Sequence, residues 1–242
     1  RDRTLLMDNV LASNIRLDGV VTVADAINGT STLEKQFEAV SQAALADLII
    51  LSKTDIALPE QIQNLKNQLE KINPTSKIIC SINGIGLQDE IWGLNALREK
   101  SSYNEVLSWT TGFEPKVTEL KNLSGLAPAK SILKPAFNHD SKIESCSIIL
   151  DNPISNTTFD NWLDTLIGVK GSDILRVKGI VFLENIDSPF VFHGVQHVFD
   201  PPVQLKNWPK KDRQSRIVVI ARNLSQFQLQ RSLDMLRIQT DD

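Results

Sequence analysis

The most informative segment of the sequence is Leu48-Ile49-Ile50-Leu51-Ser52-Lys53-Thr54-Asp55. Its first four residues form a continuous apolar run, which is typical of a strand buried on both faces of a parallel sheet. The polar tetrapeptide 52–55 follows at once. Open parallel sheets bind their ligands at the carboxyl ends of the strands, and this tetrapeptide falls at such an end. The stretch therefore predicts a buried parallel strand that presents polar side chains to a ligand.

Two further apolar runs, Gly19–Val23 and Lys77–Ser81, predict the neighbouring strands. Between the three strands, apolar side chains recur at helical spacing over residues 33–46 and 62–72, which predicts two amphipathic helices. We also expect a shorter helix over residues 89–97. Strands that alternate with helices indicate right-handed crossovers and a parallel sheet, so the first part of the chain belongs to the α/β class.

The alternation ends near residue 100. Scattered Ser, Gly and Pro residues predict a linker over residues 101–142, with one short helix at 115–123. Residues 143–242 then read as a small α+β domain whose sheet is separate from the first. Its expected strands are 146–150, 173–185, 190–199 and 216–222, and its expected helices are 158–167 and a last one opened by the capping box of Ser225 and Gln228.

Composition narrows the class of protein. The chain has 242 residues, 41% of them hydrophobic, which is ample for a buried core in one or two domains. A net charge of −3 without a Lys/Arg cluster argues against a nucleic-acid partner. No apolar run approaches the ~20 residues needed to cross a bilayer, so we expect no membrane partner.

The two cysteines, Cys80 and Cys146, lie far apart and form neither a disulfide framework nor a CxxC metal motif. We expect both to be buried small apolar side chains. Their scarcity fits a reducing compartment, which means the cytoplasm or an organelle stroma or matrix. The chain starts at Arg1 without an initiator Met, and we expect it to be a piece of a longer protein.

The side chains of residues 52–55 suit a guanine base. The Asp55 carboxylate can accept hydrogen bonds from the ring N1–H and the exocyclic amine of guanine, whereas adenine has an acceptor at N1 and no amine on C2. The aliphatic stem of Lys53 can lie along the base while its ammonium group reaches solvent or the loops. For so short a pattern the alternative is a strand-to-helix turn in which Asp55 only caps the next segment.

A second polar loop, Ser81-Ile82-Asn83-Gly84, follows the third strand. In guanine-nucleotide proteins the loop after the next parallel strand also closes over the base, through backbone N–H groups and small polar side chains. The alternative is an ordinary turn that contains glycine. The candidate nucleotide-binding residues are therefore Ser52, Lys53, Asp55, Ser81 and Asn83. We assign no catalytic residue and no metal ligand.

Several separate segments resemble one known family, the CobW-like GTP-binding proteins (CobW/HypB/UreG-type GTPases), which are relatives of the nickel-insertion GTPases. The resemblance covers nearly the whole chain and follows the family's order. Its segments are Arg16–Ala26 (RLDGVVTVADA), Gln42–Asp47, Leu51–Asp55, Leu175–Val181, His193–Phe199 and Asp212–Arg216.

The resemblance implies the remainder of a P-loop NTPase parallel sheet with flanking helices in residues 1–100. A linker over residues 101–142 and the smaller α+β CobW carboxy-terminal domain in residues 143–242 would follow. In the full-length parent it implies binding of GTP and Mg²⁺, with GTP hydrolysis coupled to delivery of zinc, cobalt or a similar metal. The partners that it implies are a guanine nucleotide and a client metalloprotein, with a homodimer as an open alternative.

The sequence departs from the family's pattern in three ways. It has neither a GxxxxGK[ST] phosphate loop nor the switch segment, and it has no CxCC metal motif. In the family these elements precede the point where this chain begins. Without backbone N–H groups and a Lys to hold the phosphates, we expect no strong grip on GTP, no Mg²⁺ site and no GTPase activity from the chain alone. Finally, Ser52 stands where the family more often has Asn or Thr, which would loosen contact with the phosphate loop.

His193 and His197 are four residues apart. On one strand they would lie about 13 Å apart, too far to share a zinc ion, so we expect structural roles, although a bulge at Gly194 would change that distance. His139 falls where many family members carry a His-rich metal-binding linker, and one His is a weak remnant of it.

The leading hypothesis is therefore a GTP-binding metallochaperone of which this chain is a piece. The alternative is a protein-interaction module, in which the second half binds a client metalloprotein and the nucleotide half is vestigial.

Overall fold

A computed structural model of the chain describes residues 17–94, 103–110, 143–196, 198–206, 208–209 and 211–237. In the first part, β1 (Val21–Asp25), β2 (Leu48–Ser52) and β3 (Lys77–Cys80) form a three-stranded sheet, here named sheet A, in the order β1-β2-β3. Both neighbouring pairs are parallel. The predicted adjacent parallel strands are confirmed, and Leu48–Leu51 are buried as the apolar run indicated.

Three helices pack on sheet A: α3 (Gly29–Lys35), α4 (Phe37–Leu45) and α5 (Pro59–Ile72). The single helix predicted over residues 33–46 is wrong, because Gln36 is extended and separates α3 from α4. Two helices satisfy the same apolar spacing, since Leu33 of α3 and Ala43 of α4 both contact the core of sheet A.

The helix predicted over residues 89–97 is also wrong for the residues that the structure describes. Residues 81–94 form a series of turns, and residues 95–97 lie outside the described part. Gly84, Gly86 and Gly93 have φ angles of 76°, 79° and 68°, a region that an α-helix cannot use. The Gly93 N–H donates to Asp18 Oδ2 over 2.6 Å, so the segment returns to the residues that precede β1.

The second part contains a five-stranded sheet, here named sheet B. Its elements are β4 (Ile143–Leu150), α7 (Asn156–Lys170), β5 (Ile174–Val181), β6 (Phe190–Val195), β7 (Val198–Gln204), β8 (Ser215–Arg222), α8 (Gln226–Asp234) and a 3₁₀ turn, Met235–Arg237. The strand order is β4-β8-β5-β6-β7, and every neighbouring pair is antiparallel. Among the described residues sheets A and B are not joined, as predicted, and the capping box of Ser225 and Gln228 opens α8.

Two strand predictions need correction. Residues 190–199 are not one strand: the chain reverses at Gln196, whose φ is 53°, and Val195 pairs with Val198 across the hairpin β6–β7. The distance argument for His193 and His197 therefore no longer holds, and His197 lies outside the described residues. The strand expected over residues 173–185 ends at Val181. At the next residue the Phe182 carbonyl oxygen accepts a hydrogen bond from the Ile154 N–H instead of from a neighbouring strand of sheet B.

An unexpected helix, α6 (Tyr103–Thr110), lies within the span predicted as linker. Its Val106 and Trp109 pack with Ile180 and Val191 of sheet B. The helix predicted at residues 115–123, and His139, lie outside the described residues. The domain boundaries at residues 100 and 142 remain predictions.

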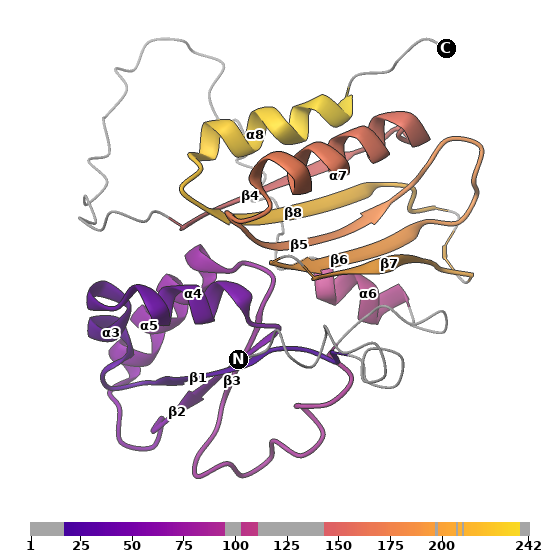
Figure 1. Cartoon of the computed structure of the whole chain (residues 1–242). Coiled ribbons are helices and arrows are strands. Elements are labelled where there is room, and N and C mark those ends of the chain that lie inside the picture. The colour runs from indigo at the N-terminus through magenta and orange to yellow at the C-terminus, as the bar shows by residue number, and fades with distance from the viewer. Residues whose placement is uncertain are drawn as a thin grey trace, which may run out of the picture.

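The layers are visible in Figure 1. Helices α7 and α8 cover one face of sheet B and enclose a core that includes the fully buried Trp162. On the other face, α6 lies below β6 and β7, and the helices of sheet A lie further to the left in this view. A cluster of Ala44, Leu175 and Ile220 joins α4 to sheet B. Helix α4 is thus packed against sheet B. Within the described residues no helix has the length and apolar character needed to cross a bilayer.

Candidate functional site

Lys53 begins the loop after β2 in an unusual backbone conformation. Its φ is 58°, a left-handed value that few non-glycine residues adopt. This turn lets the Lys53 carbonyl oxygen accept from the N–H groups of Ile56 and Ala57, over 3.4 and 3.2 Å. Backbone strain of this kind concentrates at functional sites, and here it falls on a predicted base-binding residue.

The Lys53 side chain forms an ion pair with a carboxylate from the neighbouring strand β1. Its Nζ lies 2.7 Å from Oδ2 of Asp25, the last residue of β1. Asp25 is itself fixed, because its Oδ1 accepts from the N–H groups of Ile27 and Asn28 over 2.8 and 3.2 Å. The hydrogen bond from Lys53 lowers the pKa of Asp25 to about 2, although burial acts in the opposite direction, and the two N–H groups add to the lowering. The Lys53 stem therefore has a defined direction at the carboxyl end of sheet A.

Asp55 lies in the same turn, two residues after Lys53. Its side chain is exposed, and within the described part of the chain no hydrogen bond or ion pair reaches its carboxylate. Asp55 also takes no part in the capping of α5, whose N-cap residue is Leu58 and whose capping partner is Gln61. Asp55 therefore does not cap α5.

Ser52 faces the first strand. Its Oγ donates to the Ala24 carbonyl oxygen over 3.2 Å, and its own carbonyl oxygen accepts from the Ala26 N–H over 3.0 Å. Ser52 thus ties the ends of β1 and β2 together. In this structure its hydroxyl stabilises the edge that carries Lys53 and Asp25, a role that the sequence alone did not indicate.

The loop after β3 carries the other two candidates. Ser81 is buried and its Oγ donates to the Ile85 carbonyl oxygen over 3.2 Å, so it shapes the loop from within. Asn83 is exposed with a φ of 52°, and Gly84 follows with a φ of 76°. No hydrogen bond between described residues joins Asp55 or Asn83 to another side chain. The structure therefore brings Lys53 to Asp25 and Ser52 to β1, and leaves Asp55 and Asn83 open to solvent.

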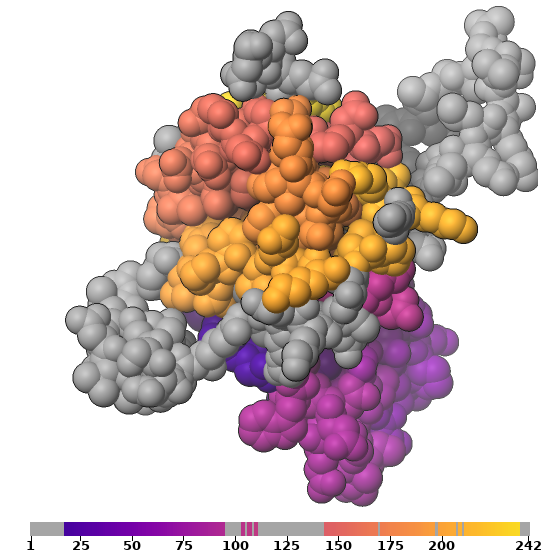
Figure 2. Space-filling model, turned by 90° about the vertical axis from the view of Figure 1, so that its right-hand side faces the viewer, coloured from indigo at the N-terminus to yellow at the C-terminus, as the bar shows by residue number. Residues whose placement is uncertain are grey.

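Apolar side chains flank these polar groups. Ile56, Ile82 and Ile85 are 67%, 46% and 76% exposed, and all three belong to the same two loops. In Figure 2, the magenta segment that contains the loop after β3 lies at the lower end of the molecule. Exposed apolar groups gathered near polar ones are typical of a ligand or partner surface.

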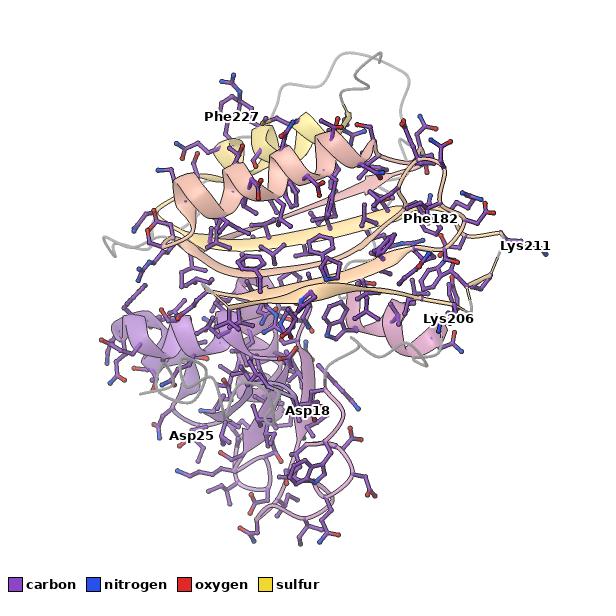
Figure 3. The ribbon with its side chains drawn as sticks, turned by 45° about the vertical axis from the view of Figure 1, so that its right-hand side comes forward. Asp18, Asp25, Phe182, Lys206, Lys211 and Phe227 are labelled. Carbon is purple, nitrogen blue, oxygen red and sulfur yellow. The ribbon has the colours of Figure 1, made fainter. Side chains whose placement is uncertain are left out.

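Asp25 is a further candidate site residue that the sequence pattern did not single out. Figure 3 labels it in the lower half of the molecule, where sheet A lies. The signal was present, because Asp25 ends β1 just as residues 52–55 follow β2, and both fall at the carboxyl edge of one parallel sheet.

The two cysteines and the acidic side chains were also compared with the requirements of a metal site. Cys146 is buried as expected, whereas Cys80 at the end of β3 is exposed, so that expectation is wrong. Cys80 ends a short edge strand whose outer side no described strand covers. Within the described residues no group of three His, Cys, Asp or Glu side chains could hold a metal ion.

This geometry defines a class: an α/β half with a three-stranded parallel sheet and polar loops after β2 and β3. Residues 3–80 match the family described as CobW/HypB/UreG, nucleotide-binding domain, and residues 143–237 match the cobalamin synthesis protein cobW C-terminal domain. The two matches together cover more than half of the chain, in the expected order. The chain therefore belongs to the CobW family.

Two curated relatives agree with this assignment. The zinc-regulated GTPase metalloprotein activator 1 of Schizosaccharomyces pombe is 30% identical over 239 residues, which is 92% of this chain and 57% of the relative. The zinc chaperone YjiA of Escherichia coli strain K12 is 24% identical over 235 residues, 97% of this chain and 66% of the relative. The chain thus spans less than two thirds of the length of either relative.

The fold is also that of a solved relative. The zinc-bound crystal structure of the YjiA GTPase from E. coli matches with a TM-score of 0.71 and 22% sequence identity, over 98% of this chain and 66% of that one. A zinc-bound triple mutant of the same GTPase gives the same TM-score at 20% identity. At these identities the likeness supports the fold.

Proposed function

We propose that this chain supplies the guanine-binding loops and the carboxy-terminal domain of a GTP-binding zinc chaperone. The observation that carries the proposal is the turn after β2. There, Lys53 is oriented by Asp25 at 2.7 Å, and the exposed Asp55 carboxylate stands two residues further on. A carboxylate at this edge fits the two adjacent donors of guanine, and leaves the acceptor at N1 of adenine unmatched.

Each loop residue has a separate task in this proposal. Asp55 reads N1–H and the exocyclic amine, and the Lys53 stem lies along one face of the base. Asn83, with its left-handed backbone, presents N–H groups and an amide from the neighbouring loop. Ser52 and Ser81 hold the two loops in shape through the hydrogen bonds described above.

The metal is zinc in this proposal because both curated relatives are named for zinc. Cobalt, which the family's link with cobalamin synthesis also allows, has no support from those names. The described residues offer no cluster suited to zinc or Mg²⁺, so we assign no metal ligand. Mg²⁺ would come with GTP at a phosphate loop that this sequence does not contain.

The carboxy-terminal domain is the candidate contact for a client metalloprotein. We place the protein in a reducing compartment, because both cysteines are free thiols. A homodimer remains an alternative that solution mass measurements can decide.

Base selectivity tests the nucleotide part of the proposal. A fluorescent GDP analogue would be bound to a full-length protein that joins this chain to a phosphate loop, and then displaced by GTP or by ATP. We expect GTP to compete about a hundredfold better or more, because a site built to pair with donors rejects a base that lacks them. Equal competition by ATP would overturn the guanine assignment and would favour the interaction-module alternative.

The metal part needs a separate measurement. Zinc affinity of the same protein would be measured against a chromophoric chelator in the presence of GDP and of a non-hydrolysable GTP analogue. A zinc chaperone driven by GTP should bind zinc with different affinity in the two states. The same affinity in both states would leave guanine binding intact and would remove zinc handling from the proposal.

A further inference from the structure

A buried ionic cluster lies where sheet B meets the nucleotide-binding half, far from the base loops. Asp47, between α4 and β2, is 6% exposed, and Arg176 and Lys178 of β5 are each 1% exposed. The Arg176 guanidinium donates through Nη2 to Asp47 Oδ1 and through Nη1 to the Leu45 carbonyl oxygen. Lys178 Nζ lies 3.0 Å from the same Asp47 oxygen. One carboxylate thus meets two cations from the other sheet.

Asp47 is bound firmly to its own side of the contact. Its Oδ2 accepts from the Val20 N–H over 3.0 Å, its own N–H donates to the Val20 carbonyl oxygen over 2.7 Å, and its carbonyl oxygen accepts from the Lys77 N–H over 3.1 Å. These bonds join Asp47, which directly precedes β2, to the amino ends of β1 and β3. A Cβ at Gly19 would lie 3.3 Å from Oδ2 and only 2.5 Å from Cβ of Leu94, so this close approach depends on glycine.

Arg176 and Asn73 together satisfy the end of α4. The last carbonyl groups of a helix have no partner within it. Here the Asn73 side-chain amide donates to the carbonyl oxygens of Ala43, Ala44 and Ala46, and Arg176 takes that of Leu45. A guanidinium at a helix carboxyl end also has the sign that the helix dipole favours. Arg176 therefore completes a helix that belongs to the other half of the molecule.

Other groups face the two cations from the neighbouring elements. His193 of β6 pairs with Lys178 across the strands, and its Nε2 lies 3.5 Å from Arg176 Nη2. Trp109 of α6 turns its ring toward Lys178 Nζ at 4.6 Å and stands edge-on to His193. Among the described residues Asp47 is the carboxylate in this cluster. Burial alone would raise its pKa, but the charges of Lys178 and Arg176 outweigh that effect and hold the pKa at about 2.

We propose that Asp47 is an ionic lock: it docks the carboxy-terminal domain on the nucleotide-binding half through Arg176, and its withdrawal releases the two halves from each other. The reason is the charge balance. With Asp47 in place, Arg176 has a hydrogen-bonded partner in a dry contact. Without it, two buried cations repel each other, and the halves must separate to hydrate them. Lys178 is not the essential partner, because its charge is costly to bury beside Arg176.

The test uses the whole 242-residue chain and three substitutions. Asp47→Asn should undock the halves, Lys178→Met should keep them docked, and the double variant should recover docking in part because one cation is gone. Asp160→Asn on the outer face of α7 is the matched control for loss of one exposed carboxylate. Docking would be read from hydrogen exchange in α4 and β5, which contact each other, and from the radius of gyration by small-angle scattering.

In Asp47→Asn we expect the docking equilibrium to fall about a hundredfold or more, since breaking a buried pair leaves an uncompensated charge. Exchange should quicken in α4 and β5 while α8, on the far face of sheet B, keeps its protection. Unchanged protection of α4 in Asp47→Asn would overturn the lock. The lock would also be overturned if Asp47→Asn lost protection throughout the chain and the double variant did not regain it. Asp47 would then support folding rather than docking.

Discussion

The Asn73→Ala substitution offers a sharp test of how the amino edge of sheet A is held. Asn73 follows α5, is 0% exposed, and joins three parts of the chain. Its Nδ2 donates to the carbonyl oxygens of Ala43, Ala44 and Ala46 over 2.9, 3.1 and 2.8 Å. Its Oδ1 accepts from the N–H and hydroxyl of Thr75 over 3.1 and 2.9 Å.

The magnitude follows from these contacts. Two amide hydrogens are shared among three carbonyl groups, so the side chain contributes the equivalent of about four hydrogen bonds at about 1 kcal/mol each. Alanine removes them and leaves buried carbonyl groups without a donor. We therefore expect the free energy of unfolding to fall by about 3–5 kcal/mol. Asn73→Asp keeps the shape but loses both donors, and should cost at least as much near neutral pH.

Urea denaturation followed by far-ultraviolet circular dichroism measures this change. Asn67→Ala is the matched control, because Asn67 lies on the exposed side of α5 and accepts one hydrogen bond, from Gln63. It should change stability by less than about 0.5 kcal/mol. If Asn73→Ala also cost less than about 1 kcal/mol, the hydrogen bonds at the end of α4 would not be what fixes this edge, and the reasoning would be refuted.

Three further predictions concern the site and the lock. The isolated chain should release no phosphate from GTP above a protein-free blank, because it has no GxxxxGK[ST] loop; release by a homogeneous sample would contradict this. Asp25→Asn, in a full-length protein, should lower the affinities for GTP and for XTP by a similar factor, because Asp25 orients Lys53 and Lys53 contacts the face of the base rather than its edge. Unequal losses of affinity in competition binding would contradict this role of Asp25. Burial and the nearby Arg176 lower the pKa of Lys178 from its ordinary value of 10.5 to about 7. Between these two pH values the folded chain therefore binds fewer protons than the unfolded chain. Stability measured by urea denaturation should then rise with pH across that window, by up to about 1.4 kcal/mol per pH unit, and the rise should disappear in Lys178→Met.

The sequence contained enough to place sheet A, because its strands are short apolar runs that alternate with helical segments. Leu48–Leu51 is the clearest case, and its position fixed the polar loop that follows. The start of α8 could also be read from Ser225 and Gln228, since a capping box is a local feature. Local signals of this kind survive in the structure.

The misses depend on contacts that are distant in sequence. The reversal at Gln196 carries no Gly or Pro, and the strand character of residues on both sides hides it. Helix α6 forms where Val106 and Trp109 meet sheet B, which no local pattern shows. The ionic cluster did leave a trace, because Arg176 and Lys178 are two apart in an otherwise apolar strand and so share one face. Two cations on one face of a buried strand predict an acidic partner, but not that the partner is Asp47.

Competitive binding of GTP and XTP to the Asp55→Asn variant, in a full-length protein that contains this chain, tests whether Asp55 reads the guanine base. The substitution turns one acceptor oxygen into a donor amide, which suits the oxygen on C2 of xanthine and opposes the amine of guanine. A hydrogen bond to a charged group contributes ~1.5–3 kcal/mol, so GTP affinity should fall about tenfold or more while XTP affinity rises. Asp160→Asn should change neither. If Asp55→Asn keeps its GTP affinity and gains none for XTP, Asp55 is only a turn residue and the guanine site proposed for this chain does not exist.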